Sequence, residues 1–361
     1  MTNAKDGMNY APTAAKPAPV VGPGEFRFAA AYFDHGHIHG QINGLTEAGA
    51  ELAAIYDPDA ERMAELTKKY PGAKAARSFE EILEDDTIRL VATAAVPCDR
   101  GPTGCRVMQA GKDYFTDKCP FTSLEQLETA KTIAEQTGQK YMVYYSERLH
   151  VESAWFVDQL IQDGVIGDIV HMEIFGPHRL GKAGRPEWFF QKEKYGGILT
   201  DIASHQFDQF LHYSRCTEGT IAHAMVDNRA NSDKPGLEDV GQAVLILANG
   251  VQCFSRVNWF TPDGMRGWGD GRTFITGTKG VIEIRKYFDF ARSNEGNIIF
   301  LADGNDDKEL HVGGQVGFPF FGQFILDCLN RTDYAMTQHH AFQASRLSLQ
   351  AQALADASRT A

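Results

Sequence analysis

The sequence FRFAAAYFDHGHIHG, residues 26–40, decides the fold class. An apolar run from Phe26 to Phe33 leads into an amphipathic segment from about His37 to Ala48, which is typical of a buried strand followed by a helix. The alternation continues to Tyr145 and predicts six strands with helical crossovers, hence a parallel, doubly wound sheet. The strands that the pattern bounds are Phe26–Phe33, Glu51–Ile55, Leu90–Ala95, Asp113–Thr116 and Tyr141–Tyr145, and the helices include Asp59–Lys69, one opened by the capping box Ser78–Glu81, Thr103–Ala110 and Ser123–Thr137.

The second half of the chain has a different pattern. A helix over Val151–Asp163 precedes an apolar strand over Asp168–Phe175, and four shorter runs follow, with a composition that suits a sheet with one solvated or partner-covered face. These runs are Asp239–Leu247, Gln252–Asn258, Arg272–Gly277 and Val281–Arg285, and two closing helices, Phe320–Cys328 and His339–Ala357, are expected to pack back on the chain. We therefore expect an arm over residues 1–25, a nucleotide-binding domain over 26–148 and a second domain over 149–361.

Length and charge exclude several classes of protein. The 361 residues suit two domains, and 47 acidic against 35 basic residues give a net charge of −12, which disfavours nucleic acids and anionic membranes as partners. No window approaches the roughly 18 apolar residues of a spanning helix. Six cysteines without a C-x-x-C pair argue against a disulfide framework or zinc knuckle, so we expect a cytoplasmic protein.

The first 25 residues are rich in alanine and proline and lack a basic start and an apolar core. They are not typical of a secretory signal. A flexible arm is the simplest interpretation, and an arm that lies along a partner subunit is the alternative, because proline lowers the entropy lost on docking.

The first turn does not have the G-x-G-x-x-G pattern, so a pyrophosphate would depend on Gly36 and the helix N-terminus behind it. Asp57 follows the second strand, where an acid can bind the adenosine ribose hydroxyls and repel a 2′-phosphate, which favours NAD; alternatively, Asp57 caps the helix near Asp59. Ligands of such sheets bind beyond the carboxyl ends of the strands. The candidate cofactor-binding residues are Phe33, Asp34, His35, Gly36, His37, Ile38, Asp57, Ala95, Val96, Pro97, Asp117 and Lys118.

His35, His37 and His39 could suggest a metal site. Alternate spacing in a turn seldom brings three imidazoles together without a carboxylate or cysteine partner, so we expect no metal.

Two segments are candidates for the chemistry. Lys118 follows the fifth strand and puts an ammonium at the mouth of the nucleotide crevice, although many lysines at strand ends are only solvated. The second segment, Gly196-Gly197 through Asp201 to His205, is a glycine turn that leads into a helix. Residues four apart share a helix face, so Asp201 could orient His205 for proton transfer. Spacing alone favours a helix cap and a packed histidine.

Together with the strand–helix half, these segments resemble the Gfo/Idh/MocA family of NAD(P)-dependent oxidoreductases. The family's E-K-P element corresponds to Asp117-Lys118-Cys119, and its G-G-x-x-x-D-x-x-x-H element to Gly196, Gly197, Asp201 and His205. The likeness extends from about Phe26 to Ser358. Asp117 and Cys119 depart from the family's Glu and Pro, which leaves open the backbone geometry around Lys118.

The resemblance implies a Rossmann domain followed by an α+β domain with a large open, mostly antiparallel sheet that pairs subunits into homodimers or homotetramers. It implies oxidation of a secondary alcohol of a sugar or cyclic polyol, or reduction of the matching ketone, with NAD. In this set Lys118 would bind the reacting oxygen, His205 would exchange its proton and Asp201 would orient His205.

Sugar recognition needs hydrogen-bonding groups beside an aromatic surface. Each candidate has a surface or core interpretation as its alternative: Glu147, Arg148, His178, Arg179 and Trp188. The stretches Trp259–Asp263 and Trp268–Gly271 line either the site or an intersubunit contact.

Three functions compete. The leading one is an NAD-dependent sugar or polyol dehydrogenase. The alternative is an NAD-assisted glycoside lyase or hydrolase that oxidises, eliminates and re-reduces. A nucleotide sensor is disfavoured, because a sensor has no need of Lys118, Asp201 and His205 together.

Overall fold

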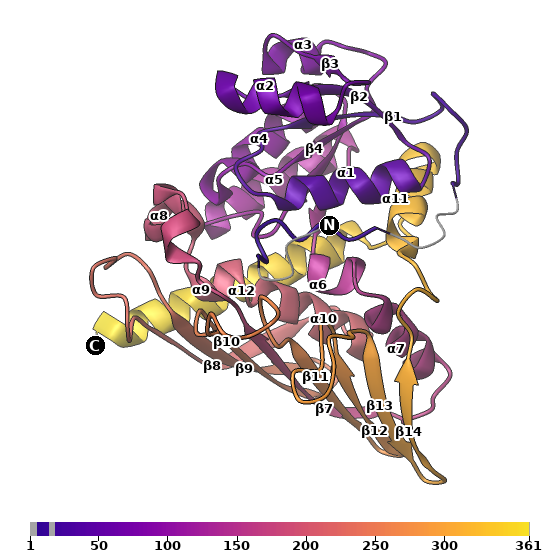
Figure 1. Cartoon of the computed structure of the whole chain (residues 1–361), viewed down its shortest axis with the longest axis vertical. Coiled ribbons are helices and arrows are strands. Elements are labelled where there is room, and N and C mark those ends of the chain that lie inside the picture. Colours follow the sequence, from indigo (N-terminus) through magenta and orange to yellow (C-terminus); the bar gives the residue numbers. More distant parts are fainter. Residues whose placement is uncertain (1–5, 14–18, 361) are drawn as a thin grey trace.

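The computed structural model describes residues 6–13 and 19–360 and contains two sheets (Figure 1). The first is a six-stranded parallel sheet in the order β3-β2-β1-β4-β5-β6, the strand order of a Rossmann fold, as predicted. Its elements are β1 (Arg27–Ala31), α1 (His37–Glu47), β2 (Glu51–Tyr56), α2 (Ala60–Lys69), β3 (Lys74–Ala75), α3 (Phe79–Leu83), β4 (Leu90–Thr93), α4 (Pro97–Gln109), β5 (Asp113–Asp117), α5 (Leu124–Thr137) and β6 (Tyr141–Tyr144). β3 has only two residues, too few for a pattern to bound it.

Helix α4 begins six residues before the predicted start at Thr103, and Pro102 lies inside it. The early part of the helix contains Gly101 and Gly104, which sequence patterns treat as breakers. Gly104 is needed for packing, because a Cβ there would lie 2.6 Å from the ring of Tyr114. Tertiary contact therefore overrides local propensity in this helix.

The second sheet has eight strands in the order β14-β13-β12-β11-β7-β10-β9-β8 and is antiparallel except for the β7–β10 pair. This confirms the expected open, mostly antiparallel sheet. Its elements and the helices around it are α6 (Ser146–Leu149), α7 (Glu152–Gln162), β7 (Ile169–Pro177), η1 (Lys182–Gly184), η2 (Glu187–Phe190), α8 (Lys192–Tyr195), α9 (Ile198–Asp201), α10 (Ser204–Ser214), β8 (Gly219–Asp227), β9 (Val240–Leu247), β10 (Gln252–Asn258), β11 (Arg272–Gly277), β12 (Gly280–Arg285), β13 (Ile298–Asp303), β14 (Asp307–His311), α11 (Pro319–Asn330) and α12 (Gln338–Thr360). Sequence patterns missed β8, β13 and β14.

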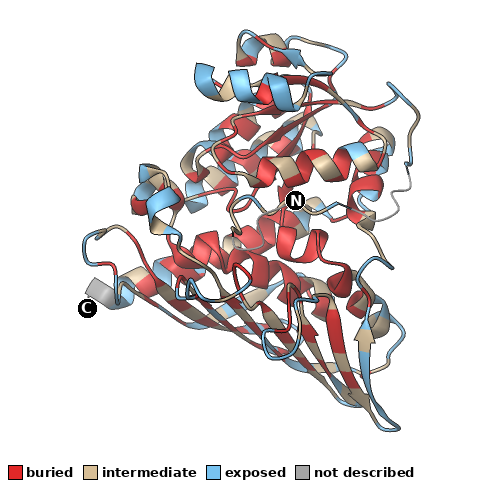
Figure 2. Cartoon of the chain, in the orientation of Figure 1, coloured by how far each residue is buried: buried red, intermediate tan, exposed pale blue. Residues whose placement is uncertain are grey.

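One face of this sheet is covered and the other is open. Buried residues alternate with more exposed ones along β9 and β10, and α9, α10 and α12 lie on the covered side (Figure 2). The open face carries exposed apolar side chains. They include Val170, Met225, Ile246 and Val281.

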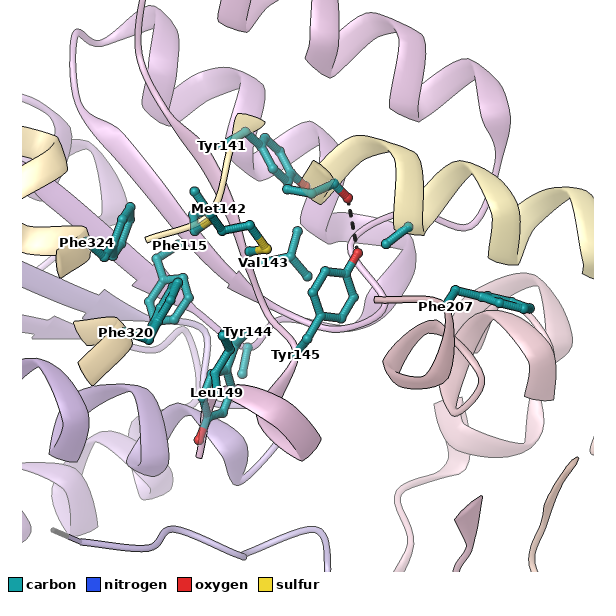
Figure 3. Close-up of a cluster of buried hydrophobic side chains, with 14 of the residues drawn as sticks. Phe115, Tyr141, Met142, Val143, Tyr144, Tyr145, Leu149, Phe207, Phe320 and Phe324 are labelled. Carbon is teal, nitrogen blue, oxygen red and sulfur yellow. Dashed lines mark hydrogen bonds between the residues drawn. The ribbon is translucent and has the colours of Figure 1, made fainter. Parts of the chain in front are cut away.

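An aromatic cluster joins the first sheet to the C-terminal helices (Figure 3). The Phe115 ring of β5 packs 5.9 Å from Phe320 and 5.3 Å from Phe324 of α11, and the Tyr145 hydroxyl donates to the Ala341 carbonyl of α12 at 3.1 Å. The closing helices thus pack back as expected, and they hold the carboxyl ends of β5 and β6 against the second domain. Within the described ranges, no helix is long and apolar enough to cross a membrane.

Candidate active site

A cavity lies between the carboxyl ends of the first sheet and the covered side of the second. Lys118 follows β5, Glu147 lies on α6, and Asp201 and His205 belong to α9 and α10; all four line the cavity. The cavity has room for only about 30 Å³ of solvent, enough for one or two water molecules. Ligand sites are usually about 300–1,000 Å³, so a sugar ring needs this cavity to open.

Lys118 and Asp201 form a buried ion pair. The Lys118 Nζ donates to Asp201 Oδ1 at 2.6 Å, and both side chains are at most 10% exposed. The Lys118–Cys119 peptide bond is cis. The pair connects the two candidate segments, which lie 83 residues apart in the chain.

The expected contact between Asp201 and His205 is not formed. α9 ends at Asp201 and α10 begins at Ser204, so the two residues do not share one helix face. The rule for residues four apart requires an uninterrupted helix. The Asp201 carboxylate pairs with Lys118, and the expectation that it orients His205 is corrected.

Glu147 is the carboxylate that acts on His205. Burial lowers the pKa of His205 to about 3, and the negative charge of Glu147 opposes this shift. The His205 Nδ1 atom is buried without a hydrogen-bond partner. The imidazole is therefore neutral at physiological pH and able to accept a proton.

Glu147 is held in place by a buried lysine. Lys286 donates to Glu147 Oε2 at 3.1 Å, and the Gln206 amide donates to the same oxygen at 3.2 Å. Burial alone would raise the pKa of Glu147, but Lys286, His205 and His178 together lower it to about 2. The other oxygen, Oε1, is buried, accepts no hydrogen bond from the described residues and lies 3.6 Å from His178 Nε2.

The buried His205 imidazole makes stability depend on pH. Because its pKa falls from 6.5 in the unfolded chain to about 3 in the fold, the unfolded chain takes up a proton below pH 6.5 and the fold does not. The free energy of unfolding should fall by about 2 kcal/mol through this group between pH 7 and pH 5. Urea unfolding of His205→Gln should show a smaller decrease in the free energy of unfolding between pH 7 and pH 5 than that of the wild type.

His311→Gln is the control with the opposite sign. Hydrogen bonding to Glu295 raises the pKa of His311, so its contribution is present at low pH and is lost as pH rises through the folded pKa. The same pH dependence in wild type and His205→Gln would contradict the assignment of a neutral His205.

Two of the three turn histidines meet at Asp117. His37 Nδ1 lies 3.0 Å and His35 Nδ1 3.2 Å from the Asp117 carboxylate, which Arg100 also reaches at 3.3 Å. Burial alone would raise the pKa of Asp117, but these three partners hold it well below its usual value. Asp117 is thus the carboxylate partner of His35 and His37 that the sequence pattern did not predict. The possible metal-ligand atoms of these three residues lie within 4.8 Å of one another. His39 points elsewhere, to the Tyr70 hydroxyl at 2.6 Å.

Arg100 argues against a cation in this cluster, because its guanidinium already neutralises Asp117. Our expectation that the site has no metal therefore stays a prediction.

Asp57 follows β2, as expected, and organises the first turn. One oxygen accepts from the Phe33 amide at 2.7 Å and from Arg62 at 2.9 Å, and the other accepts from the Asp59 amide at 2.9 Å. The cap of α2 is Asp59, so the alternative role for Asp57 as the helix cap is wrong. Arg62 also bonds Asp34 at 3.1 Å, and this directs Asp34 toward Arg62.

The remaining cofactor candidates fit a dinucleotide at this edge of the sheet. Helix α1 begins behind Gly36, whose position has no capping side chain, and His35 Nδ1 accepts from the His37 amide at 3.3 Å, so the remaining N-terminal amides suit a pyrophosphate. Val96 is the N-cap of α4, and Pro97 lines the cavity at its first turn. Ile38 is fully buried in the core, and the Ala95 carbonyl accepts from Arg100 at 2.7 Å, so these two residues shape the edge.

The N-terminal segment Asp6–Ala11 covers this edge from its own chain. The Gly7 carbonyl lies 3.2 Å from His37 Nε2, and the Ala11 carbonyl accepts from Asn43 at 3.3 Å. A Cβ placed on Gly36 would lie 2.6 Å from the Met8 carbonyl. The segment therefore lies where a pyrophosphate would approach α1. Residues 1–5 and 14–18 of the predicted flexible arm lie outside the described residues.

Two predicted substrate ligands lie outside the cavity lining. Arg148 forms a buried bidentate pair with Asp208, with both distances 2.7 Å. Arg179 binds the carbonyls of Pro262, Met265 and Gly267 and so anchors a loop. The expectation that Arg148 and Arg179 contact the substrate is therefore corrected. In both cases the guanidinium is occupied by acceptors of the protein itself, which only the fold brings close to it.

His178 and Trp188 do line the cavity, and so do both predicted aromatic stretches through Trp259 and Trp268. Sequence reasoning missed further lining residues. Arg185 could have been found, because it lies three residues before Trp188 in the same polar and aromatic stretch. The residues missed are Gly7, Met8, Tyr10, Arg100, Ser146, Arg185, Phe189, Ile202 and Tyr287.

This fold combines a Rossmann sheet, the class of fold that binds dinucleotides, with a second, mostly antiparallel sheet, and a polar cavity lies between the two. Comparison with known proteins agrees: residues 20–145 match the family described as oxidoreductases with an NAD-binding Rossmann fold, and residues 156–283 match the GFO/IDH/MocA C-terminal domain. The chain belongs to the GFO/IDH/MocA oxidoreductase family, and its first domain is an NAD-binding Rossmann domain.

Three relatives illustrate the likeness. A solved structure from Erwinia carotovora atroseptica, provisionally described as an oxidoreductase, is 42% identical with a TM-score of 0.89 and covers 92% of this chain and 99% of its own. D-xylose dehydrogenase of Paenarthrobacter nicotinovorans is 27% identical over 44% of this chain, and the match spans only 40% of its length. The scyllo-inositol 2-dehydrogenase (NAD(+)) of Bacillus subtilis is 25% identical over 69% of this chain and 70% of its own.

Proposed function

We propose that this protein is an NAD-dependent dehydrogenase that interconverts a secondary alcohol and a ketone of a sugar, a sugar derivative or a cyclic polyol. The observation that carries the proposal is the cavity in which Lys118, Asp201 and His205 meet beyond the carboxyl ends of the Rossmann strands. A neutral imidazole and a buried ammonium at one cavity suit proton transfer at a hydroxyl.

Each residue has a separate task. Lys118 donates a hydrogen bond to the reacting oxygen and stabilises its developing negative charge. Asp201 fixes that ammonium through their 2.6 Å contact. His205 takes the hydroxyl proton in oxidation and returns it in reduction, and the buried Glu147 stabilises the imidazolium that forms meanwhile.

NAD, when bound, supplies the acceptor for the hydride of the alcohol carbon. The chain's contribution to binding is the N-terminus of α1 at Gly36 for the pyrophosphate and Asp57 for the ribose hydroxyls.

The class of substrate is inferred from two kinds of support. The names of the relatives in the previous section specify a sugar and an inositol. The cavity walls contain Trp188, Trp259 and Trp268, whose rings suit the apolar face of a sugar ring, next to Glu147 Oε1, which accepts no hydrogen bond from the described residues. We also propose a homodimer or homotetramer that forms through the open sheet face.

The test is NADH absorbance against time with NAD and a panel of sugars, inositols and aryl glycosides, together with an assay of aglycone release. Reduction of NAD by a free sugar or inositol is expected. Release of aglycone without accumulation of NADH, or silence in both assays, would overturn the proposal.

Asp57→Ala should raise the dissociation constant for NAD by about tenfold or more, because charged hydrogen bonds to the ribose are lost. The substitution also removes one of the two acids that Arg62 binds, at 2.9 Å, and leaves Asp34 as its acidic partner, so the guanidinium is more available to a 2′-phosphate. Discrimination against NADP should therefore decrease. Titration of each cofactor by protein fluorescence measures both effects.

Glu61→Ala is the matched control, because Glu61 is exposed in the first turn of the same helix. A wild-type preference for NADP would contradict the role of Asp57.

Deletion of residues 1–11 should lower the dissociation constant for NAD, because the segment and the pyrophosphate compete for the face of Gly36. The change is about tenfold if the segment leaves this face open for about a tenth of the time. Deletion of residues 1–5 alone keeps Asp6–Ala11 and is the control. Equal NAD affinity in the two deletion variants, measured by calorimetry, would show that the segment does not compete.

A further inference from the structure

Arg185 is a cation at the cavity that the proposed chemistry does not use. It lies between η1 and η2 and lines the cavity with Lys118 and Asp201. Its guanidinium stacks 4.4 Å from the ring centre of Phe189 and 5.0 Å from that of Trp259. These rings hold the side chain rigidly at the substrate end of the cavity.

Its hydrogen bonds leave the charge uncompensated. Nε donates to the Leu180 carbonyl at 2.8 Å and Nη2 to the Arg179 carbonyl at 3.3 Å, both in the same loop. No carboxylate of the described residues forms an ion pair with Arg185. Burial accordingly lowers the pKa of its guanidinium. Arg185 is half-buried, so its cation has lost part of its hydration, and an arriving anion offsets the cost of that loss.

The other cations at the cavity all have acidic partners. Within the described part of the chain, Lys118 pairs with Asp201 at 2.6 Å, Arg100 with Asp117 at 3.3 Å and Lys286 with Glu147 at 3.1 Å. The cavity thus carries one positive charge in excess, although the whole chain has a net charge of −12. A neutral sugar would leave that charge unmatched.

We propose that Arg185 binds a negatively charged group on the substrate, a carboxylate or a phosphate carried by the sugar or polyol. This rests on the proposed function. Two acids act on Arg185 through their charges, Asp201 and Asp6. Asp201 is already neutralised by Lys118. Asp6 belongs to the N-terminal segment that we propose competes with NAD, so the position of Asp6 is available to the anion of the substrate once that segment leaves.

The charged group therefore sets specificity and takes no part in the chemistry. Arg185 presents planar N–H donors, which match a carboxylate or phosphate oxygen. Lys118 and His205 act on a hydroxyl of the same substrate, at a distance that the cavity fixes. We expect the acidic form of a sugar to bind more tightly than its neutral counterpart.

The experiment compares D-glucuronate, D-glucose and glucose 6-phosphate as ligands of the full-length, NADH-loaded protein by calorimetry. The wild type should bind one of the charged sugars about 10- to 100-fold more tightly than glucose, the range for one charged hydrogen-bonded contact. Arg185→Met should reduce this ratio to about one, and Arg185→Lys should restore part of it. Preference for glucuronate assigns a carboxylate, and preference for glucose 6-phosphate assigns a phosphate.

Arg256→Met is the matched control, since Arg256 also stacks on an aromatic ring, 4.7 Å from the centre of Phe175, away from the cavity. A merely structural Arg185 would weaken all three ligands equally and leave the ratio unchanged. That result, or equal or undetectable binding of charged and neutral sugars by wild type, would overturn the inference. Oxidation of neutral sugars without preference would refute only this inference, whereas failure of all sugars to reduce NAD would refute the proposed function itself.

Discussion

Replacement of Lys118 by methionine should lower turnover by about 100- to 1,000-fold and leave NAD affinity largely unchanged. The size follows from the loss of one charged donor at an oxygen that gains negative charge, an effect of about 3–4 kcal/mol in other enzymes. Methionine keeps most of the length of the side chain and removes the charge together with its N–H donors. Initial rates of NADH formation at saturating NAD would measure the effect.

The substitution also leaves Asp201 buried without its partner, which costs about 3–5 kcal/mol of stability. The double variant Lys118→Met/Asp201→Asn removes both charges and separates this loss from the catalytic effect. We expect the double variant to regain stability but not turnover. Lys68→Met, on the exposed side of α2, is the control, and wild-type turnover in folded Lys118→Met would remove Lys118 from the mechanism.

His205→Ala should reduce turnover by at least about a hundredfold, the usual contribution of a positioned general base. The neighbouring carboxylates are poor substitutes, because Lys286 holds Glu147 at 3.1 Å and helps to lower its pKa to about 2, and Lys118 holds Asp201 at 2.6 Å. The substitution should lower kcat more than it raises KM, because the imidazole binds the proton that is transferred in the transition state. Rate measurements with added imidazole provide a second readout, because the free base should restore part of the rate.

His223→Ala is the control, because His223 is exposed on β8, remote from the cavity lining. Thermal melts of each variant would establish that it is folded. Folded His205→Ala with normal turnover would show that another group moves the proton, and Glu147 would then be the first candidate.

The local patterns of the sequence determined the fold class, because they need only neighbouring residues. Apolar runs such as Phe26–Phe33 and the helical segments between them predicted the parallel sheet, and its strand order confirmed it. β14 could not be found in this way, because four of its five residues are charged or histidine and it lies at the sheet edge. Such an edge strand is held by backbone hydrogen bonds to the neighbouring strand, and its own side chains contribute no apolar pattern.

The sequence by itself also supplied Lys118, Asp201 and His205 as candidates, through two short motifs that fold locally. Only the tertiary structure decided which charged residues form ion pairs. Lys118 pairs with Asp201, 83 residues away in the chain, and Lys286 pairs with Glu147, 139 residues away. The helix ends at Asp201, so the expected contact with His205 is not formed. Arg148 pairs with Asp208, and Arg185 forms no ion pair with an acid among the described residues. The physical reason is that a buried charge is stable only beside an opposite charge or hydrogen-bonding partners. Which groups become neighbours depends on the packing of elements that lie far apart in the chain.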